Sequence, residues 1–171
     1  MTNPYTAGDV PPKQECALTV ETGQPAPEFT LKDQAGNDVS LSDYRGTQPV
    51  VLVFYPFTFT GVCQGELCEI RDDPSVFDGA GAAVLAVSCD TRHAQAQWAE
   101  QQGFTFPILS DFWPHGEVAK AYGVFNEQLG CANRGTFVID RDGVVVATFE
   151  SAGLATPRAR EDYEQALAKV T

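Results

Sequence analysis

The chain has 171 residues and a formal net charge of -12, with 11 Lys and Arg against 23 Asp and Glu. Nucleic acids and anionic membranes are bound through clustered basic side chains, so this acidity argues against both partners. The length fits one domain, and 43% hydrophobic residues suffice for a buried core. The sequence has no run approaching the ~20 apolar residues of a membrane span and no secretory signal pattern. We therefore expect a cytoplasmic protein.

The five cysteines are odd in number and do not form the dense pattern of a disulfide framework. They stand at positions 16, 63, 68, 89 and 131. This usage is typical of a reducing compartment, where a cysteine in a special position more often has a chemical than a structural role.

The N-terminal part divides into an extension and the start of the domain. Residues 1–22 are rich in Pro, Thr and Gly without periodicity, which predicts a flexible extension, and the domain is expected over residues 23–171. Alternating apolar residues on both sides of a turn at 33–37 predict a short hairpin over residues 29–41. Residues 42–46 then connect to the next strand.

The middle of the chain has the pattern of a βαβ unit. Residues 50–55 are apolar, β-branched or aromatic and predict a buried strand, which ends at Pro56. Residues 64–73 predict a helix with Leu67 and Ile70 on one face. Residues 82–88 predict a second strand, of the kind buried on both faces of a parallel sheet.

The remaining elements complete an α/β pattern. We expect a helix from Asp90 or Thr91 to Gln102, ended by Gly103. Then follow a short strand at 106–109, a short helix at 116–122, a hairpin of 135–140 with 144–149 around Asp142-Gly143, and a helix at 157–170. This order describes a thioredoxin-like core, with a central mixed sheet flanked by helices and an N-terminal hairpin.

Cys63 lies where the first buried strand passes into the following helix. A helix N-terminus presents unpaired backbone N–H groups and the positive end of the helix dipole, which favour an anion. Cys63 is therefore a candidate thiolate nucleophile. The alternative is that Cys63 is a small buried hydrophobic residue, as most lone cysteines are.

The residues around Cys63 resemble those of the peroxiredoxins. Residues 56–63, PFTFTGVC, match the family's P-x-x-x-T-x-x-C pattern. Further matching stretches are FYP at 54–56, GEL at 65–67, SDF at 110–112 before VA at 118–119, and RGTFVID at 134–140. The resemblance runs from about Gly23 to the C-terminus, and residues 59–67, 125–128 and 132–137 look most like the AhpE-type branch. It implies a thiol-dependent peroxidase.

The resemblance also implies a role for each site residue. Cys63 would be the peroxidatic cysteine, whose thiolate attacks a peroxide oxygen and becomes a sulfenic acid. Thr60 would hold the thiolate or peroxide with its hydroxyl, and Arg134 would favour the thiolate and orient the peroxide. The backbone N–H groups of Val62 and Cys63 would complete the donors around the transition state, and Pro56 would limit water access. Without the resemblance, Thr60 would be an N-cap and Arg134 a surface charge.

Glu66 has two interpretations. It can act as a capping-box acid in the first turn of the helix, or it can form an ion pair with Arg134. We favour the capping role, because an exposed acid near a helix start is common.

Cys68 does not fit the pattern of a one-cysteine enzyme. It lies five residues after Cys63, and this spacing resembles that of the resolving cysteine in the PrxQ or bacterioferritin-comigratory branch. Five residues of an intact helix give ~7.5 Å of rise and ~140° of rotation. A disulfide needs Cα atoms within ~7 Å, so this bond would require local unwinding, which Gly65 makes easier. The alternative is that Cys68 packs on the apolar face of the helix.

The other three thiols are weaker candidates. Cys131 stands three residues before Arg134 and could approach the site, whereas Cys89 ends an apolar strand and should be buried and inert. Cys16 could pair with Cys63 or with a second subunit, although a cysteine in a terminal extension is usually incidental.

We expect no metal or cofactor. The cysteines, His93 and His115 have neither C-x-x-C nor H-x-x-x-H spacing, and GAG at 79–81 precedes a strand where a dinucleotide fingerprint would follow one. The expected partners are a peroxide, a thiol reductant (thioredoxin, mycoredoxin or a low-molecular-weight thiol) and a second copy in a homodimer. The substrate could be hydrogen peroxide, an organic hydroperoxide or peroxynitrite. The alternative function is a non-enzymatic thiol redox sensor on the same fold.

Overall fold

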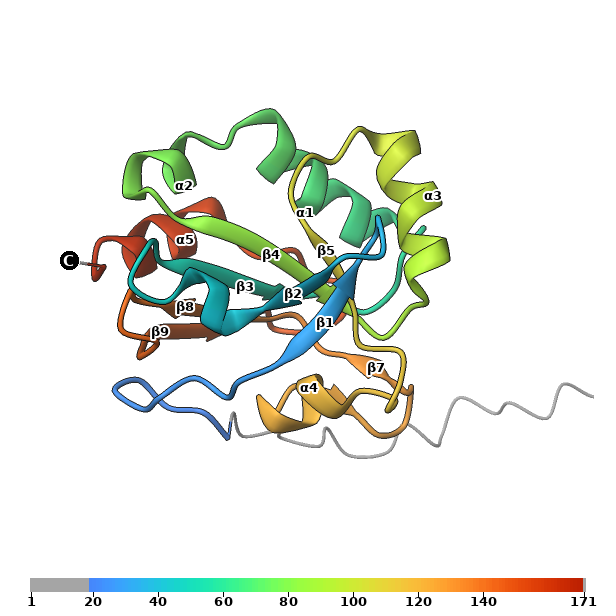
Figure 1. Cartoon of the computed structure of the whole chain (residues 1–171). Coiled ribbons are helices and arrows are strands. Elements are labelled where there is room, and N and C mark those ends of the chain that lie inside the picture. Colours follow the sequence, from blue (N-terminus) through green and yellow to red (C-terminus); the bar gives the residue numbers. More distant parts are fainter. Residues whose placement is uncertain (1–18, 171) are drawn as a thin grey trace, which may run out of the picture.

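A seven-stranded mixed sheet organises the computed structural model, which describes residues 19–170 (Figure 1). The strand order is β2-β1-β5-β4-β3-β8-β9. The strands are β1 (Thr30–Asp33), β2 (Asp38–Ser40), β3 (Val50–Phe54), β4 (Ala83–Ser88), β5 (Ile108–Ser110), β8 (Gly135–Ile139) and β9 (Val145–Glu150). β3, β4 and β5 run parallel, and the other pairings are antiparallel.

Both hairpins and the βαβ unit form where the sequence predicts them. β1 pairs with β2 around the turn at 33–37, where Asp33 accepts hydrogen bonds from the backbone N–H groups of Ala35 and Asn37. β8 pairs with β9, and Gly143 in their connection has φ 82°, the left-handed conformation that favours glycine. The thioredoxin-like mixed α/β fold is therefore confirmed.

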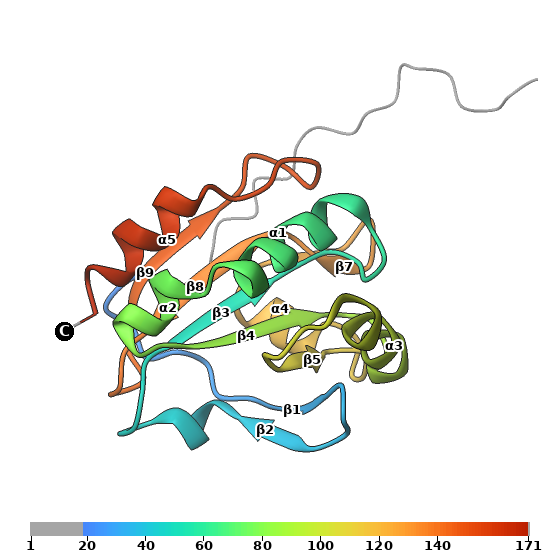
Figure 2. The same ribbon diagram turned by 90° about the horizontal axis from the view of Figure 1, so that it is seen from above.

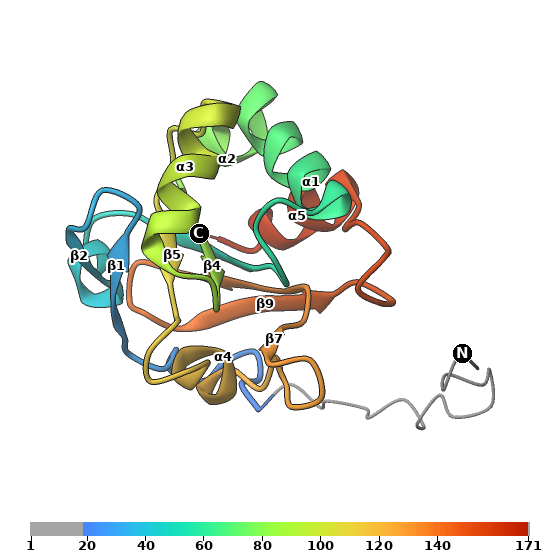
Figure 3. The same ribbon diagram turned by 90° about the vertical axis from the view of Figure 1, so that its right-hand side faces the viewer.

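Helices cover both faces of the sheet in two groups, as Figures 1 and 2 show. The first group is α1 (Gly61–Asp72), α2 (Ser75–Ala80), α3 (Arg92–Gln102) and α5 (Arg160–Leu167), and the other is α4 (Glu117–Ala121). α3 has the expected ends, since Thr91 Oγ1 accepts a hydrogen bond from Ala94 N and Gly103 closes the helix at φ 69°. Figure 3 shows α4 and the region of β6 (Phe125–Asn126) and β7 (Cys131–Ala132) on the side of the sheet opposite α1 and α3.

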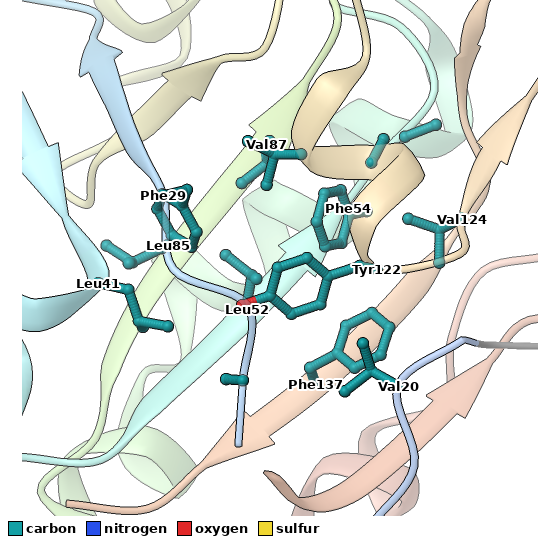
Figure 4. Close-up of a cluster of buried hydrophobic side chains, with 14 of the residues drawn as sticks. Val20, Phe29, Leu41, Leu52, Phe54, Leu85, Val87, Tyr122, Val124 and Phe137 are labelled. Atoms are coloured by element: carbon teal, nitrogen blue, oxygen red, sulfur yellow. The ribbon is translucent and has the colours of Figure 1, made fainter. Parts of the chain in front are cut away.

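The sheet separates two hydrophobic cores. Successive residues of β3 point to opposite faces, so Leu52 and Phe54 join one core while Val51 and Val53 join the other. The first core lies under α4, where Tyr122 packs its ring against Phe54 and Phe137 (Figure 4). The second core lies under α1, α2, α3 and α5 and contains Cys63. The reactive thiol candidate is thus anchored in a packed layer.

Several boundaries differ from the predictions. α1 begins at Gly61 instead of residue 64, and α5 begins at Arg160 instead of residue 157. α2 and a two-stranded sheet of β6 (Phe125–Asn126) and β7 (Cys131–Ala132) have no counterpart in the expected elements. Val20 is buried in the first core, so the packed domain includes residues that we expected in the extension. Cys16 lies outside the described residues.

The helices between residues 19 and 170 include none that is long and apolar enough to cross a membrane.

Candidate active site

A short loop carries the chain from β3 to α1 and places Cys63. Pro56 is buried at its start, and the backbone N–H of Thr58 donates to Asp90 Oδ2 at 2.8 Å. The hydroxyl groups of Tyr55 and Thr58 are 3.1 Å apart. Phe59 has φ 63°, a conformation that few residues other than glycine adopt, and its exposed ring lies 6.3 Å from the ring of Trp98. These contacts fix the entry to the helix.

Cys63 is the third residue of α1 and is completely buried. The first N–H groups of an α-helix have no partner within the helix, and the positive end of the helix dipole lies there. In addition, Arg134 Nη2 lies 3.1 Å from Cys63 Sγ. The structure thus places two features that favour an anion next to this buried thiol.

Arg134 is held from three sides. It lies directly before β8, and its side chain is buried. Its Nε donates to the carbonyl of Leu154 at 2.8 Å, and its Nη1 donates to Glu66 Oε2 at 2.5 Å. Only Nη2 therefore faces the sulfur, and the guanidinium has a fixed orientation toward it.

Glu66 joins Arg134 to a second buried arginine, Arg158. Its carboxylate accepts from Arg134, from the backbone N–H of Arg158 at 2.7 Å, and from Arg158 Nε and Nη2 at 3.0 Å each. The preference for an exposed capping-box acid was wrong, because Glu66 lies on the buried side of α1, one turn after Cys63, where only the arginines can satisfy it. A buried carboxylate requires such pairing.

Arg158 was missed by the sequence reasoning. Its Nη1 donates to the carbonyl groups of Phe54 and Gly135 and to Thr136 Oγ1, at 2.9, 3.1 and 3.2 Å. It thereby ties the ends of β3 and β8 to Glu66. The residue stands in the Thr156-Pro157-Arg158 stretch, where no local pattern separates a buried arginine from an exposed one.

The other expected site residues lie nearby but differ in their contacts. Thr60 is the N-cap residue of α1, and its exposed hydroxyl donates to the carbonyl of Phe57 at 2.8 Å. The hydroxyl hydrogen of Thr60 is thus engaged with the Phe57 carbonyl. Val62 is half-buried in the first turn of α1, and Pro56 is buried at the start of the loop. The structure gathers the expected set at one end of the sheet.

The remaining described thiols have different surroundings. Cys68 is half-buried on the intact α1, with its Sγ 3.7 Å from Gln102 Oε1 and packed against the second core. Cys89 and Cys131 are buried, and this burial raises the pKa of Cys89 to about 12 and the pKa of Cys131 to about 11. Both remain protonated near neutral pH. Among residues 19–170 there is no group of three or more His, Cys, Asp or Glu side chains that could hold a metal ion.

The comparisons with known proteins agree with this geometry. The model of the AhpC/TSA family matches residues 22–148. Alkyl hydroperoxide reductase E of Mycobacterium tuberculosis is 55% identical over 126 residues, covering 74% of this chain and 82% of that protein. Chloroplastic peroxiredoxin Q of Sedum lineare is 38% identical over 140 residues, covering 81% and 74%. The crystal structure of peroxidoxin BcpB from M. tuberculosis has a TM-score of 0.76 and 35% identity, covering 88% and 96%.

A thioredoxin-like fold with a buried thiol at a helix start beside an arginine defines a thiol-dependent oxidoreductase. The chain belongs to the AhpC/TSA family of peroxiredoxins. It is a thiol-dependent peroxidase, related both to the mycobacterial alkyl hydroperoxide reductase E proteins and to the peroxiredoxin Q group.

Proposed function

We propose that Cys63 is the peroxidatic nucleophile of this peroxidase. The observation that carries the proposal is the 3.1 Å contact between Arg134 Nη2 and Cys63 Sγ at the start of α1. A guanidinium held in this position stabilises the thiolate before the reaction. It can also donate to the peroxide oxygens as negative charge moves onto the leaving oxygen.

The proposed reaction consists of one displacement. The Cys63 thiolate attacks the nearer peroxide oxygen, the O–O bond breaks, and the electron pair leaves on the second oxygen. That oxygen takes a proton and departs as water or an alcohol, while Cys63 becomes a sulfenic acid. The backbone N–H groups of Val62 and Cys63 would support the developing charge. Thr60 would hold the bound peroxide if its hydroxyl turned from the Phe57 carbonyl toward it.

Cys68 is the proposed resolving cysteine. Its thiol would attack the Cys63 sulfenic acid, release water and form an intramolecular disulfide, which an external thiol then reduces. The relatedness to peroxiredoxin Q supports this step. Both cysteines lie on one unbroken helix, so the attack requires residues 61–68 to leave the helical conformation. If Cys68 instead keeps its packed position beside Gln102, the sulfenic acid is reduced directly by the external thiol.

A comparison of wild type with Cys68→Ser tests this step. After one equivalent of hydrogen peroxide, intact mass should show a loss of two hydrogens in the wild type and a gain of one oxygen in the variant. Cys131→Ser is the matched control and should behave as the wild type. Equal lifetimes of the sulfenic acid in wild type and Cys68→Ser would exclude Cys68 as the resolving residue.

The finer properties of the reaction remain predictions. Exposed Phe57 and Phe59 beside the site offer apolar surface to an organic hydroperoxide, which favours such substrates alongside hydrogen peroxide and peroxynitrite. Thioredoxin, mycoredoxin and a low-molecular-weight thiol are the candidate reductants, and repeated turnover with one of them would exclude a sensor that is oxidised once. The homodimer and the cytoplasmic location are part of the same proposal.

A further inference from the structure

A cavity of about 320 Å³ lies between α1, α2 and α5, on the sheet face that also carries Cys63. The three helices lie together over this face in Figure 2. The volume is in the range of small-molecule sites, which are concave and mainly apolar with a few polar groups. The cavity shares Glu66 and Arg158 with the thiol site but opens beside the later turns of α1. No step of the peroxidase reaction uses it.

The cavity has an apolar wall suited to a ring or a branched chain. Ile70 comes from α1, Val76 and Phe77 from α2, and Tyr163 from α5. The rings of Phe77 and Tyr163 meet edge to face, with centroids 5.4 Å apart. Because the side chains come from three packed helices, the wall exists before any ligand arrives.

Tyr163 adds a buried polar group to the residues that line the cavity. Its side chain is 7% exposed and its hydroxyl is buried. The Thr136 side chain is a hydrogen-bonding neighbour that opposes the rise of the Tyr163 pKa caused by burial, although no described residue meets the hydroxyl in close hydrogen-bond geometry. Buried hydroxyl groups normally have a partner. A ligand that hydrogen-bonds this hydroxyl would give it a closer partner than Thr136.

The charge around the cavity is negative. Its lining contains four acidic side chains and two arginines. Arg158 is engaged with Glu66, and Arg160 pairs with Asp73 and Glu164. Asp72 is paired with Arg71, which leaves the exposed carboxylate of Glu69 as the one lining acid without a hydrogen bond or ion pair among the described residues. A cation is therefore the complementary charge.

We propose that this cavity is a binding site for a small apolar amine. The hydrocarbon part would pack against Ile70, Phe77 and Tyr163, and the ammonium group would face Glu69. The Tyr163 hydroxyl would hydrogen-bond a polar group of the ligand or a water that the ligand orders. Anionic compounds are disfavoured because Glu69, Asp72 and Asp73 line the cavity.

Three probes share a phenyl ring and differ in charge: 2-phenylethylamine, 2-phenylethanol and phenylacetate. They distinguish the effect of ligand charge on binding from the effect of burying the ring. Binding is measured by NMR titration of the full-length, reduced Cys63→Ser protein, so that no redox chemistry contributes. We expect the amine to bind with a dissociation constant on the order of 1 mM or tighter. The alcohol should bind roughly two- to fivefold more weakly and the carboxylate more weakly still, which is the size of an exposed ion-pair effect. Shifts should localise to α1, α2 and α5.

Three variants test the contacts. Glu69→Gln should weaken the amine roughly two- to fivefold without changing the alcohol, and Glu100→Gln on α3 is the matched control that should change neither. Tyr163→Phe keeps the ring but removes the hydroxyl. It should weaken the binding of each probe that hydrogen-bonds this hydroxyl directly or through an ordered water. Val76→Trp fills the cavity and should remove saturable binding, while far-ultraviolet circular dichroism verifies its fold.

Two outcomes would overturn the proposal: phenylacetate binding as tightly as 2-phenylethylamine, or none of the three probes giving saturable shifts in the folded protein. Neither outcome bears on the peroxidase, whose turnover is measured separately with Cys63 in place.

Discussion

Cys63 has the same burial as Cys131 but very different neighbours. Both side chains are completely buried, and Cys89 is nearly so. Desolvation raises the pKa of Cys131 to about 11 and that of Cys89 to about 12, with nearby acids such as Asp90 adding to the effect. Cys63 instead lies at the start of α1 with Arg134 at 3.1 Å from its sulfur. Burial without a neighbouring cation keeps Cys131 and Cys89 protonated, whereas the proposed reactivity of Cys63 rests on the guanidinium beside its sulfur.

The largest expected effect comes from replacing each of the two thiols in turn. Cys63→Ser should lose peroxidase turnover completely, because a serine hydroxyl does not ionise at neutral pH and cannot form a sulfenic acid. Cys131→Ala should keep turnover near the wild-type value, since its thiol stays protonated. Stopped-flow consumption of hydrogen peroxide with dithiothreitol as reductant measures both. Strong impairment of Cys131→Ala in a folded protein would show that the second thiol participates.

Removal of the cation should have the next largest effect. Arg134→Met keeps much of the side-chain volume and leaves Glu66 paired with Arg158, so the fold should persist. We expect the second-order rate constant with peroxide to fall about 10²–10³-fold, the usual loss when one preorganised donor to a developing anion is removed. Arg134→Lys should fall in between, because an ammonium group cannot contact both Glu66 and Cys63 in the same planar arrangement. A rate within a factor of two of wild type would contradict the assigned role.

The raised pKa values of Cys89 and Cys131 should affect how the free energy of unfolding depends on pH. Their pKa is raised in the folded state, so their contribution is complete below the unfolded pKa near 9 and is lost as pH rises toward about 11 and 12. The free energy of unfolding should therefore fall above pH 9, with a slope of about 1.4 kcal/mol per pH unit for each thiol. Urea unfolding at pH 8 to 10.5 should show a shallower decline for Cys131→Ala. Parallel curves would indicate that this thiol ionises equally in both states.

Local chemistry made much of the fold predictable. Thr91 and Gly103 bound α3 because a side-chain cap and a left-handed glycine act within a few residues. The β8–β9 hairpin follows from Asp142-Gly143 in the same way. The apolar runs of β3 and β4 predict strands buried on both faces, and their parallel pairing is confirmed. Cys63 was predicted as the nucleophile from its position between strand and helix together with the surrounding motif, and the structure places Arg134 Nη2 3.1 Å from its sulfur.

Long-range pairing was not predictable. Arg158 lies 92 residues after Glu66, and nothing near either residue indicates their contact. The start of α5 was misplaced for the same reason. Pro157 suits a first helical turn, but the side chain of the next residue, Arg158, points into the domain and pairs with Glu66. The helix therefore begins later, at Arg160, where Asp162 accepts a hydrogen bond from the backbone N–H of Ala159. A buried ion pair can thus override a local signal.

The three-residue spacing of Glu66 from Cys63 sets a condition on any disulfide with Cys68. To bring the two sulfur atoms together, α1 must open across Glu66, which would withdraw the carboxylate from Arg134 and Arg158 and leave both guanidinium groups buried without it. The folded state of α1, with its ion pairs of Glu66, is therefore favoured over the open state that the Cys63–Cys68 disulfide needs. Such a disulfide would have a comparatively oxidising reduction potential and would be reduced readily, and the regained ion pairs would return the site to its starting geometry for the next peroxide.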